Sequence, residues 1–399
     1  MKKDVLTFFS PFPPTQSGVS DYSFAIVKSI SRENGVLSIV KTPQEKDFLN
    51  SHGLAADIFD ETAMPAGLSI FQIGNSAAHD YLFRAALKTP GIVVIHDLLL
   101  HGLLKAATLA YGEIAEYKSL MEFEGPSGHL IAERTLVGDF KPFYSAFAGG
   151  HKKLVEGALS VIVHSNWAAQ FVRRENETVP IHVIPHFCDS TIDPADREAR
   201  ILTTRERLGI SKESFVISHF GFVTESKQLN LLIRISLLLQ EKLDLHLLIA
   251  GAGSRDLLST ERSSLSLVRK KTIVDHLPEQ VLDDSILASN LVSLLRYPSS
   301  GETSGIGARC LAMGRPAVCF DYYAYSDFPR DVAVHIPLDT SNAEAAAEAI
   351  LAAVTSPDFV KKREAAALRW AGDQMHLSRV TASYNAVIAS CRDKFPRPS

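Results

Sequence analysis

One acid in a turn of small residues carries the clearest chemical signal of this chain. Glu302 lies between an apolar run that ends at Leu295 and a helix-like segment, which a strand-like run follows. Thr303 or Ser304 can cap that helix, and its dipole and free N–H groups attract an anion. The segment therefore predicts a site for an anionic or polyhydroxyl ligand, with a simple capping acid as the equally frequent alternative.

Two further candidates follow strand-like runs. His96 comes directly after the apolar run 92–95, and Lys227 ends the loop Gly221–Lys227 after the run 215–220. A histidine in this position can donate to sugar hydroxyls or neutralise charge. A lysine suits a diphosphate as a flexible point charge. Taken singly, a structural histidine and a solvated lysine are the more frequent alternatives.

The first loop, Ser10–Tyr22, joins a strand-like run to a helical pattern. Gly18 has no Cβ, so the backbone there can approach a ligand closely. Ser20 or Asp21 is the expected cap of the following helix. An ordinary loop with a helix cap is the alternative of equal weight.

Several other chemistries are disfavoured. Gly251-Ala-Gly253 lacks the third glycine of a dinucleotide fingerprint, and the chain has no Walker A sequence. No Asp-x-Asp motif occurs, and His96 and His101 do not share a helix face, so no metal is expected. The four cysteines are scattered without a Cys-x-x-Cys pair, which fits a reducing compartment. A net charge of −4 gives no support for a nucleic-acid binder.

The size and composition predict two globular domains in a soluble chain. The sequence has 399 residues, of which 46% are hydrophobic and 22% charged. The start, MKKDVLTFFSPFPP, is typical of a first strand, because proline breaks its short apolar run. No stretch reaches the roughly 18 uninterrupted apolar residues that span a bilayer. We therefore expect a cytoplasmic protein, with action at the inner face of a membrane left open.

Short apolar runs alternate with longer amphipathic stretches, which predicts α/β units around parallel sheets. The expected strands are 5–9, 36–40, 68–73, 92–95, 159–163, 181–184, 215–220, 245–250, 272–274, 291–295 and 317–320. A polar segment, Cys188–Arg200, is the expected linker. The tail 343–391 is expected to be helical with a break near Gly372. We predict one domain over 1–190, a second over 191–375 and a C-terminal helix over 376–399, with doubly wound, Rossmann-like architecture.

Taken together and in order, these segments resemble the retaining glycosyltransferases of family 4 (glycosyl transferases group 1), which have the GT-B fold. The similarity covers nearly the whole chain. It rests on the segments Pro13–Gly18, Val163–Asn166, Val183–His186, Gly221–Lys227, Leu248–Gly253 and Pro298–Pro316.

The resemblance implies two domains that face a central cleft, an acceptor domain over 1–190 and a donor domain over 191–375. It also implies a C-terminal helix that crosses back to the N-terminal domain. It implies transfer of a hexose-type sugar from a UDP- or GDP-sugar to a glycan, a lipid-linked or a small-molecule acceptor. No metal or other cofactor is implied. Retention would come from same-face attack, with a leaving-group phosphate oxygen accepting the acceptor's proton.

The resemblance also assigns roles to residues. Lys227 would hold the diphosphate, Glu302 would bind sugar hydroxyls, and His96 would contact the donor sugar near the reacting carbon. The remaining donor-binding positions would be Gly18, Gly221, Thr303, Ser304, Gly305, Ile306 and Arg309.

Two positions depart from the family pattern. Phe222 stands where the family usually has arginine, and Arg296 is another cation that can replace it. Arg309 stands where a second glutamate usually binds the ribose, and arginine cannot accept a hydrogen bond. These departures keep a degenerate nucleotide-sugar-binding partner subunit open as an alternative. A nucleotide-sugar epimerase of the same architecture is the other alternative, although no suitable set of acids and bases is evident.

Overall fold

The computed structural model describes residues 5–63, 67–188, 192–193, 195–253, 262–275, 277–356 and 358–392. The chain forms two compact units. Unit 1 consists of Met1–Pro185, Ser300–Thr303 and Leu377–Ser399, and unit 2 of His186–Ser299 and Ser304–His376. Parts of the expected linker (189–191 and 194) and of the expected C-terminal segment (393–399) lie outside the described residues.

Unit 1 is built on a seven-stranded parallel sheet with the order β3-β2-β1-β4-β5-β6-β7. Its strands are buried on both faces by helices, which is why they are continuous apolar runs in the sequence. The strands are β1 (Leu6–Phe9), β2 (Val36–Val40), β3 (Ala56–Ile58), β4 (Ser69–Ile73), β5 (Ile92–Ile95), β6 (Ser160–Val163) and β7 (Ile181–Val183).

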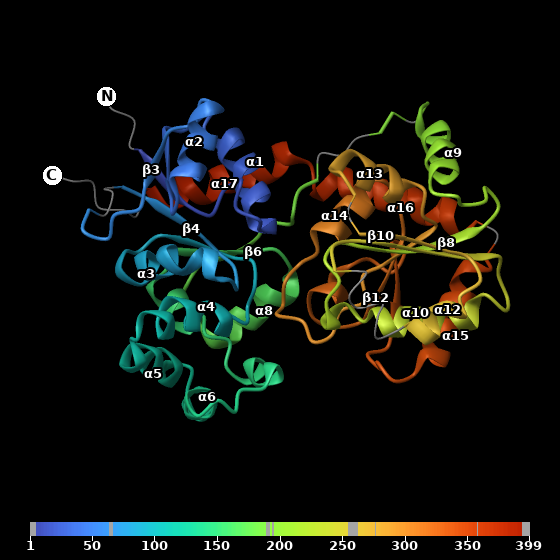
Figure 1. The fold of residues 1–399 in the computed structure, drawn as a ribbon. Helices are drawn as coiled ribbons and strands as arrows, with labels where there is room; N and C mark the ends of the chain where they lie inside the picture. Colours follow the sequence, from blue (N-terminus) through green and yellow to red (C-terminus); the bar gives the residue numbers. More distant parts are fainter. Residues whose placement is uncertain are drawn as a thin grey trace. The chain divides into compact units, whose positions relative to one another are not determined.

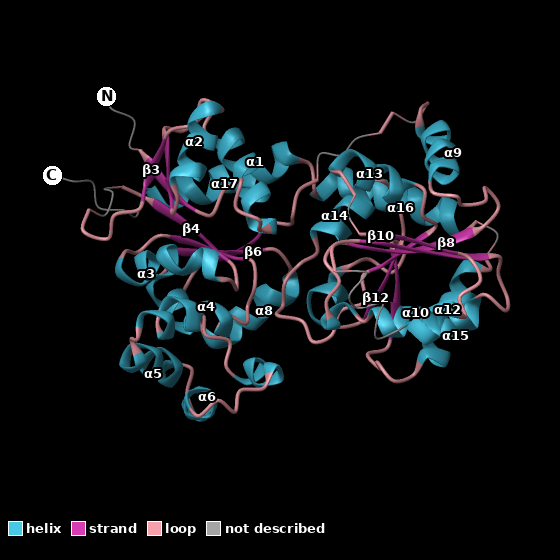
Figure 2. Cartoon of the chain, in the orientation of Figure 1, coloured by secondary structure: helices cyan, strands magenta, loops and turns pink. Residues whose placement is uncertain are grey.

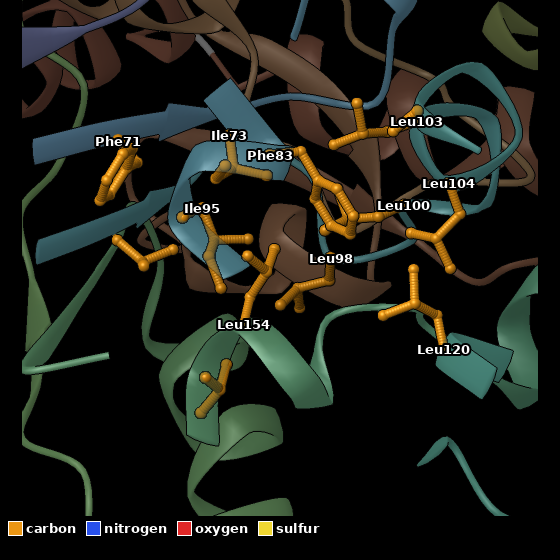
Figure 3. Close-up of a cluster of buried hydrophobic side chains, with 14 of the residues drawn as sticks. Phe71, Ile73, Phe83, Ile95, Leu98, Leu100, Leu103, Leu104, Leu120 and Leu154 are labelled. Atoms are coloured by element: carbon orange, nitrogen blue, oxygen red, sulfur yellow. The ribbon is translucent and has the colours of Figure 1, made fainter. Parts of the chain in front are cut away.

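Helices cover both faces of this sheet (Figure 1). On one face lie α1 (Gly18–Ile30), α2 (Pro43–Ser51) and α17 (Leu377–Arg392). On the other face lie α3 (Asp80–Lys88), α4 (His101–Ala107), α7 (Lys152–Gly157) and α8 (Asn166–Glu175), and α5 (Ile114–Phe123) and α6 (Pro126–Leu136) pack beyond α4. Figure 3 shows the apolar side chains between this second group and the sheet, among them Phe71, Ile73 and Ile95 from the strands and Phe83 and Leu154 from the helices.

The C-terminal helix α17 packs against α1, as the predicted fold class requires. The Tyr384 hydroxyl lies 3.0 Å from that of Tyr22, and Thr381 Oγ1 donates to Ser29 Oγ at 2.8 Å. Both tyrosines are almost fully buried, so the contact is part of the core of unit 1.

Unit 2 is built on a six-stranded parallel sheet with the order β10-β9-β8-β11-β12-β13. The strands are β8 (Phe215–Phe220), β9 (Leu245–Ala250), β10 (Lys271–Val274), β11 (Leu291–Ser293), β12 (Ala317–Phe320) and β13 (Ala333–Ile336). One face carries α10 (Leu229–Leu239), α12 (Arg262–Ser266) and α15 (Ala343–Val354), and the other α9 (Arg197–Arg207), α13 (Glu279–Leu287), α14 (Gly305–Ala312) and α16 (Phe359–Gln374) (Figure 2).

The predicted fold class is confirmed, and the predicted strands are present with ends that differ by at most two residues. Two strands were not expected: β3 is short and largely exposed, and β13 is a four-residue run. The expected break near Gly372 is present. Gly372 lies in the last turn of α16, and the interruption falls between Gln374 and Leu377. Among the described residues, no helix combines the length and the apolar character that a membrane span requires.

Candidate functional site

In both sheets the strand order reverses, between β1 and β4 in unit 1 and between β8 and β11 in unit 2. Ligands of open parallel sheets bind outside the carboxyl ends of the strands at such a point. The predicted residues lie in loops that leave this edge. Gly18 follows β1 and His96 follows β5, whereas Gly221 and Lys227 follow β8.

Lys227 lies over the backbone of Gly221. A Cβ added to Gly221 would be 3.0 Å from Lys227 Nζ and 3.8 Å from Ile306 Cγ1. Gly221 also has φ +89°, a conformation that favours glycine. Its N–H donates to Ala250 O at 3.0 Å, which fixes the turn at the end of β8. The structure thus brings together three residues that the sequence nominated separately: Gly221, Lys227 and Ile306.

The first turn of α14 lies beside this lysine, because Ile306 is its second residue. Ser304 is the cap, since its hydroxyl accepts from Gly307 N at 3.0 Å. Gly305 is exposed, and an added Cβ would meet no atom within 4 Å. The partial positive charge of the helix start therefore adds to the charge of Lys227, and this edge of unit 2 is suited to an anion.

Glu302 does not cap the helix. Its Oε2 accepts from Ser300 N at 2.6 Å, and the segment Ser300–Thr303 belongs to unit 1. The backbone N–H groups of Leu98 and Leu99 donate to Ser300 O at 2.8 and 3.1 Å. Glu302 is thereby held close to the residues that follow His96.

Thr303 has a buried hydroxyl that lacks a hydrogen-bond partner among the described residues. A buried polar atom of this kind costs stability unless something bonds to it. This agrees with the predicted role of Thr303 in donor binding, which stays a prediction.

His96 is buried, and both of its ring nitrogens have partners. Nε2 lies 2.7 Å from Gln72 Oε1, and Nδ1 lies 3.1 Å from Nε2 of His164. Nδ1 of His164 is 2.8 Å from Ile184 O, and burial lowers the pKa of His164 to about 4. His164 is therefore neutral at pH 7, donates through Nδ1 and accepts through Nε2, so the proton between the two rings belongs to Nδ1 of His96.

Further polar groups lie beyond His96. The Gln72 side chain is close enough to the Tyr384 hydroxyl to affect its pKa, although Gln72 Nε2 has no hydrogen-bond partner among the described residues. The Tyr384 hydroxyl lies within hydrogen-bond distance of that of Tyr22. The Tyr22 ring lies edge-on to His96 and His164, with centroids 5.1 and 5.4 Å away. We call Tyr22, Gln72, His96, His164 and Tyr384 the buried polar network. Its one local sequence signal is a glutamine in an otherwise apolar strand.

The first loop is anchored by a buried carboxylate. Glu45 accepts from Phe12 N at 3.0 Å and from Thr15 Oγ1 at 2.8 Å. The expected cap at Ser20 or Asp21 is wrong: α1 begins earlier, at Gly18, and Ser17 accepts from Val19 N. Gly18 is exposed, and an added Cβ would meet no atom within 4 Å, so packing within the protein does not demand glycine there.

Two other candidates have structural partners. Arg309 forms an ion pair with Asp283 at 2.8 Å, between α14 and α13. His101 stacks on Phe140 with centroids 4.2 Å apart, and its Nε2 lies 2.7 Å from the hydroxyl of Tyr117. The ion pair gives Arg309 a role in packing, and its predicted role in donor binding stays a prediction.

No family model and no curated protein matches this chain. Solved structures do match over nearly its full length. Sucrose-phosphate synthase from Thermosynechococcus elongatus is similar with a TM-score of 0.70 and 13% identity, covering 98% of this chain and 100% of its own. Anabaena Alr3699/HepE in complex with UDP-glucose has a TM-score of 0.65 and 13% identity, covering 97% and 100%. The catalytic domain of starch synthase IV from Arabidopsis thaliana, bound to ADP and acarbose, has a TM-score of 0.59 and 12% identity, covering 98% and 99%. At these identities the similarity shows the fold, which is GT-B.

Proposed function

We propose that this chain is a retaining glycosyltransferase of the family 4 type, which transfers a hexose-type sugar from a nucleoside diphosphate sugar to an acceptor. The observation that carries the proposal is the placement of Lys227 over Gly221, beside the start of α14, where the strand order of unit 2 reverses. A flexible ammonium, a close-approach glycine and a helix start are together suited to a diphosphate.

In the proposed reaction the bond between the sugar's anomeric carbon and the diphosphate oxygen breaks, and the acceptor oxygen bonds to that carbon on the same face. The acceptor's proton passes to a phosphate oxygen of the leaving diphosphate. Lys227 stabilises the negative charge that develops on that group, and backbone N–H groups at the start of α14 assist. The protein then needs no general base and no metal ion.

The structural neighbours support the donor class. Alr3699/HepE was solved with UDP-glucose, and starch synthase IV with ADP. We extend this to a UDP- or GDP-sugar donor and to a glycan, lipid-linked or small-molecule acceptor. A cytoplasmic location, at the inner face of a membrane where the acceptor is lipid-linked, completes the proposal.

The test is a panel of UDP-, GDP- and ADP-sugars, each incubated with the chain and acceptor extracts. Release of nucleoside diphosphate that depends on acceptor is the expected result, with the Lys227→Gln variant as the control. A chain that neither binds nor turns over any donor would contradict the proposal. The same assay with EDTA, and with added divalent ions, tests independence from metal.

A nucleotide-sugar-binding partner subunit is the second candidate. It is favoured by Phe222, which is 66% exposed where a cation is expected, and by Arg309, whose charge is paired with Asp283. Tight donor binding without turnover, and activity that needs a second protein, would favour this candidate over transfer.

A further inference from the structure

We propose that Arg296 is a second phosphate-binding cation of unit 2 and binds the same diphosphate as Lys227. This inference rests on the proposed function. It adds a second cation to the diphosphate site and assigns the arginine and the lysine different ways of binding phosphate. Arg296 follows β11, the strand that neighbours β8 at the point where the strand order reverses.

Two hydrogen bonds hold Arg296 next to Lys227. The backbone N–H of Tyr297 donates to Ser226 O at 2.6 Å, and Gln228 Nε2 donates to Tyr297 O at 2.6 Å. Ser226 and Gln228 are the two neighbours of Lys227 in the chain. The residue after Arg296 is therefore bonded to both chain neighbours of the lysine, so the loop that carries Arg296 is fixed against the loop that carries Lys227.

A buried histidine provides an independent observation. His219, near the end of β8, is 2% exposed, and neither ring nitrogen has a hydrogen-bond partner among the described residues. Burial, then the charges of Lys227 and Arg296, lower its pKa to about 3. Both cations thus act on the same buried ring, which places their charges together at the end of β8.

The chemistry of the two side chains suits a diphosphate better than a monophosphate. The planar guanidinium of arginine binds phosphate oxygens in pairs, whereas the lysine ammonium acts as a point charge. A diphosphate presents two groups of oxygens and offers each cation a partner. Loss of Arg296 should therefore weaken the binding of a nucleoside diphosphate more than the binding of the corresponding monophosphate.

The experiment is a calorimetric titration of the full chain and its variants with UDP, GDP, ADP, the three monophosphates and inorganic pyrophosphate. For the diphosphate that wild type binds, Arg296→Gln should weaken affinity about tenfold or more, and Arg296→Lys should restore part of it. Arg269→Gln is the control. This exposed arginine pairs with Glu241 and precedes β10, at the opposite edge of the sheet, and its replacement removes the same charge.

The outcomes separate the two proposals. If Lys227→Gln loses affinity while Arg296→Gln and Arg296→Lys bind like wild type, the role of Arg296 is wrong and the proposed function stands. If wild type binds pyrophosphate through both cations but binds no nucleotide, the two-cation site stands and the proposed function is wrong. If Arg296→Gln does not fold, Arg296→Lys decides, because it keeps the charge and removes the paired geometry. Wild-type affinity in that variant for both diphosphate and monophosphate would overturn the proposal.

Discussion

The carboxyl edges of the two sheets have the same topology and opposite chemistry. In unit 1 the members of the buried polar network, Tyr22, Gln72, His96, His164 and Tyr384, bond mainly to one another, and His164 is neutral at pH 7. In unit 2 the corresponding edge gathers Lys227 and Arg296 around a glycine turn and a helix start.

The difference lies in the loops and not in the sheets, which are both parallel and apolar on both faces. A buried, hydrogen-bonded network holds loops and helices in place, and its loss should appear as lost stability. A set of cations at an exposed edge contributes little to stability and much to anion binding. Variants in the two edges should therefore fail in different measurements.

The largest expected effect is on turnover by the Lys227→Gln variant. Removing one group that stabilises transition-state charge typically costs about 10²–10³ in rate. The unfolding midpoint should stay close to that of wild type, because Lys227 is only half-buried. Lys242→Gln, an exposed lysine beyond α10, is the matched control, and both quantities should remain unchanged in it. Equal rates for Lys227→Gln and Lys242→Gln would remove the basis for assigning anion chemistry to unit 2.

The next effect is a loss of stability at acid pH, to which three histidines of unit 1 contribute in addition to His219 of unit 2. Burial lowers the pKa of His79, His101 and His164 to about 4, below the ordinary value of 6.5. Between pH 6.5 and 4 the unfolded chain therefore binds more protons than the folded one, so stability falls as pH falls through this window and is constant above it. Each such histidine contributes at most about 1.4 kcal/mol per pH unit.

The measurement is the free energy of unfolding in urea at several pH values between 4 and 8. In His164→Asn the slope below pH 6.5 should be shallower than in wild type, because one titrating group is gone and an amide can still donate to Ile184 O. An unchanged slope would show that His164 does not stay neutral in the folded protein.

The carboxyl edges of the two sheets differ in how far the sequence alone could predict their residues. Gly221 and Lys227, which we propose to bind the anion, could be nominated from the sequence because glycine and lysine mark a loop after an apolar run. Both lie within a few residues of one strand. The parallel strands were predictable for a similar local reason, since strands buried on both faces are continuous apolar runs.

The buried polar network could not be predicted, because no local pattern joins its members. Tyr22 and Tyr384 meet across 362 positions of the chain, and His96 meets His164 across 68. Helix caps could be predicted only in part. Ser17 caps α1, where Ser20 or Asp21 was expected, whereas Ser304, one of the two expected caps of α14, is its cap. Pairing across long distances and the exact helix start are decided by tertiary packing.

A smaller effect is expected when one hydroxyl of the network is removed. Tyr384→Phe leaves the Tyr22 hydroxyl without its buried partner, which should lower the free energy of unfolding by about 1–3 kcal/mol. Binding of nucleotide to unit 2 should be unchanged. Tyr144→Phe is the matched control, because its hydroxyl has no hydrogen-bond partner in the described part of the chain. Weaker nucleotide binding in Tyr384→Phe, at unchanged stability, would contradict the division between the two edges.

The smallest effect on stability is expected from substituting two glycines that each begin a helix. These two substitutions also compare the donor binding of the two units most directly. Gly18 begins α1 in unit 1 and Gly305 begins α14 in unit 2, and an added Cβ meets no atom within 4 Å at either position. Alanine should therefore be tolerated at both, and the free energy of unfolding should rise by up to about 1 kcal/mol. Any loss of donor affinity then reflects contact with the ligand and not damage to the fold.

We expect Gly305→Ala to weaken nucleotide diphosphate binding several-fold, because the methyl group projects at the helix start beside Lys227. If Gly18→Ala weakens it as well, the first loop of unit 1 takes part in donor binding, as the resemblance implies. If only Gly305→Ala does, the donor's phosphates are held by unit 2 alone. Wild-type affinity in both variants would mean that neither helix start approaches the phosphates.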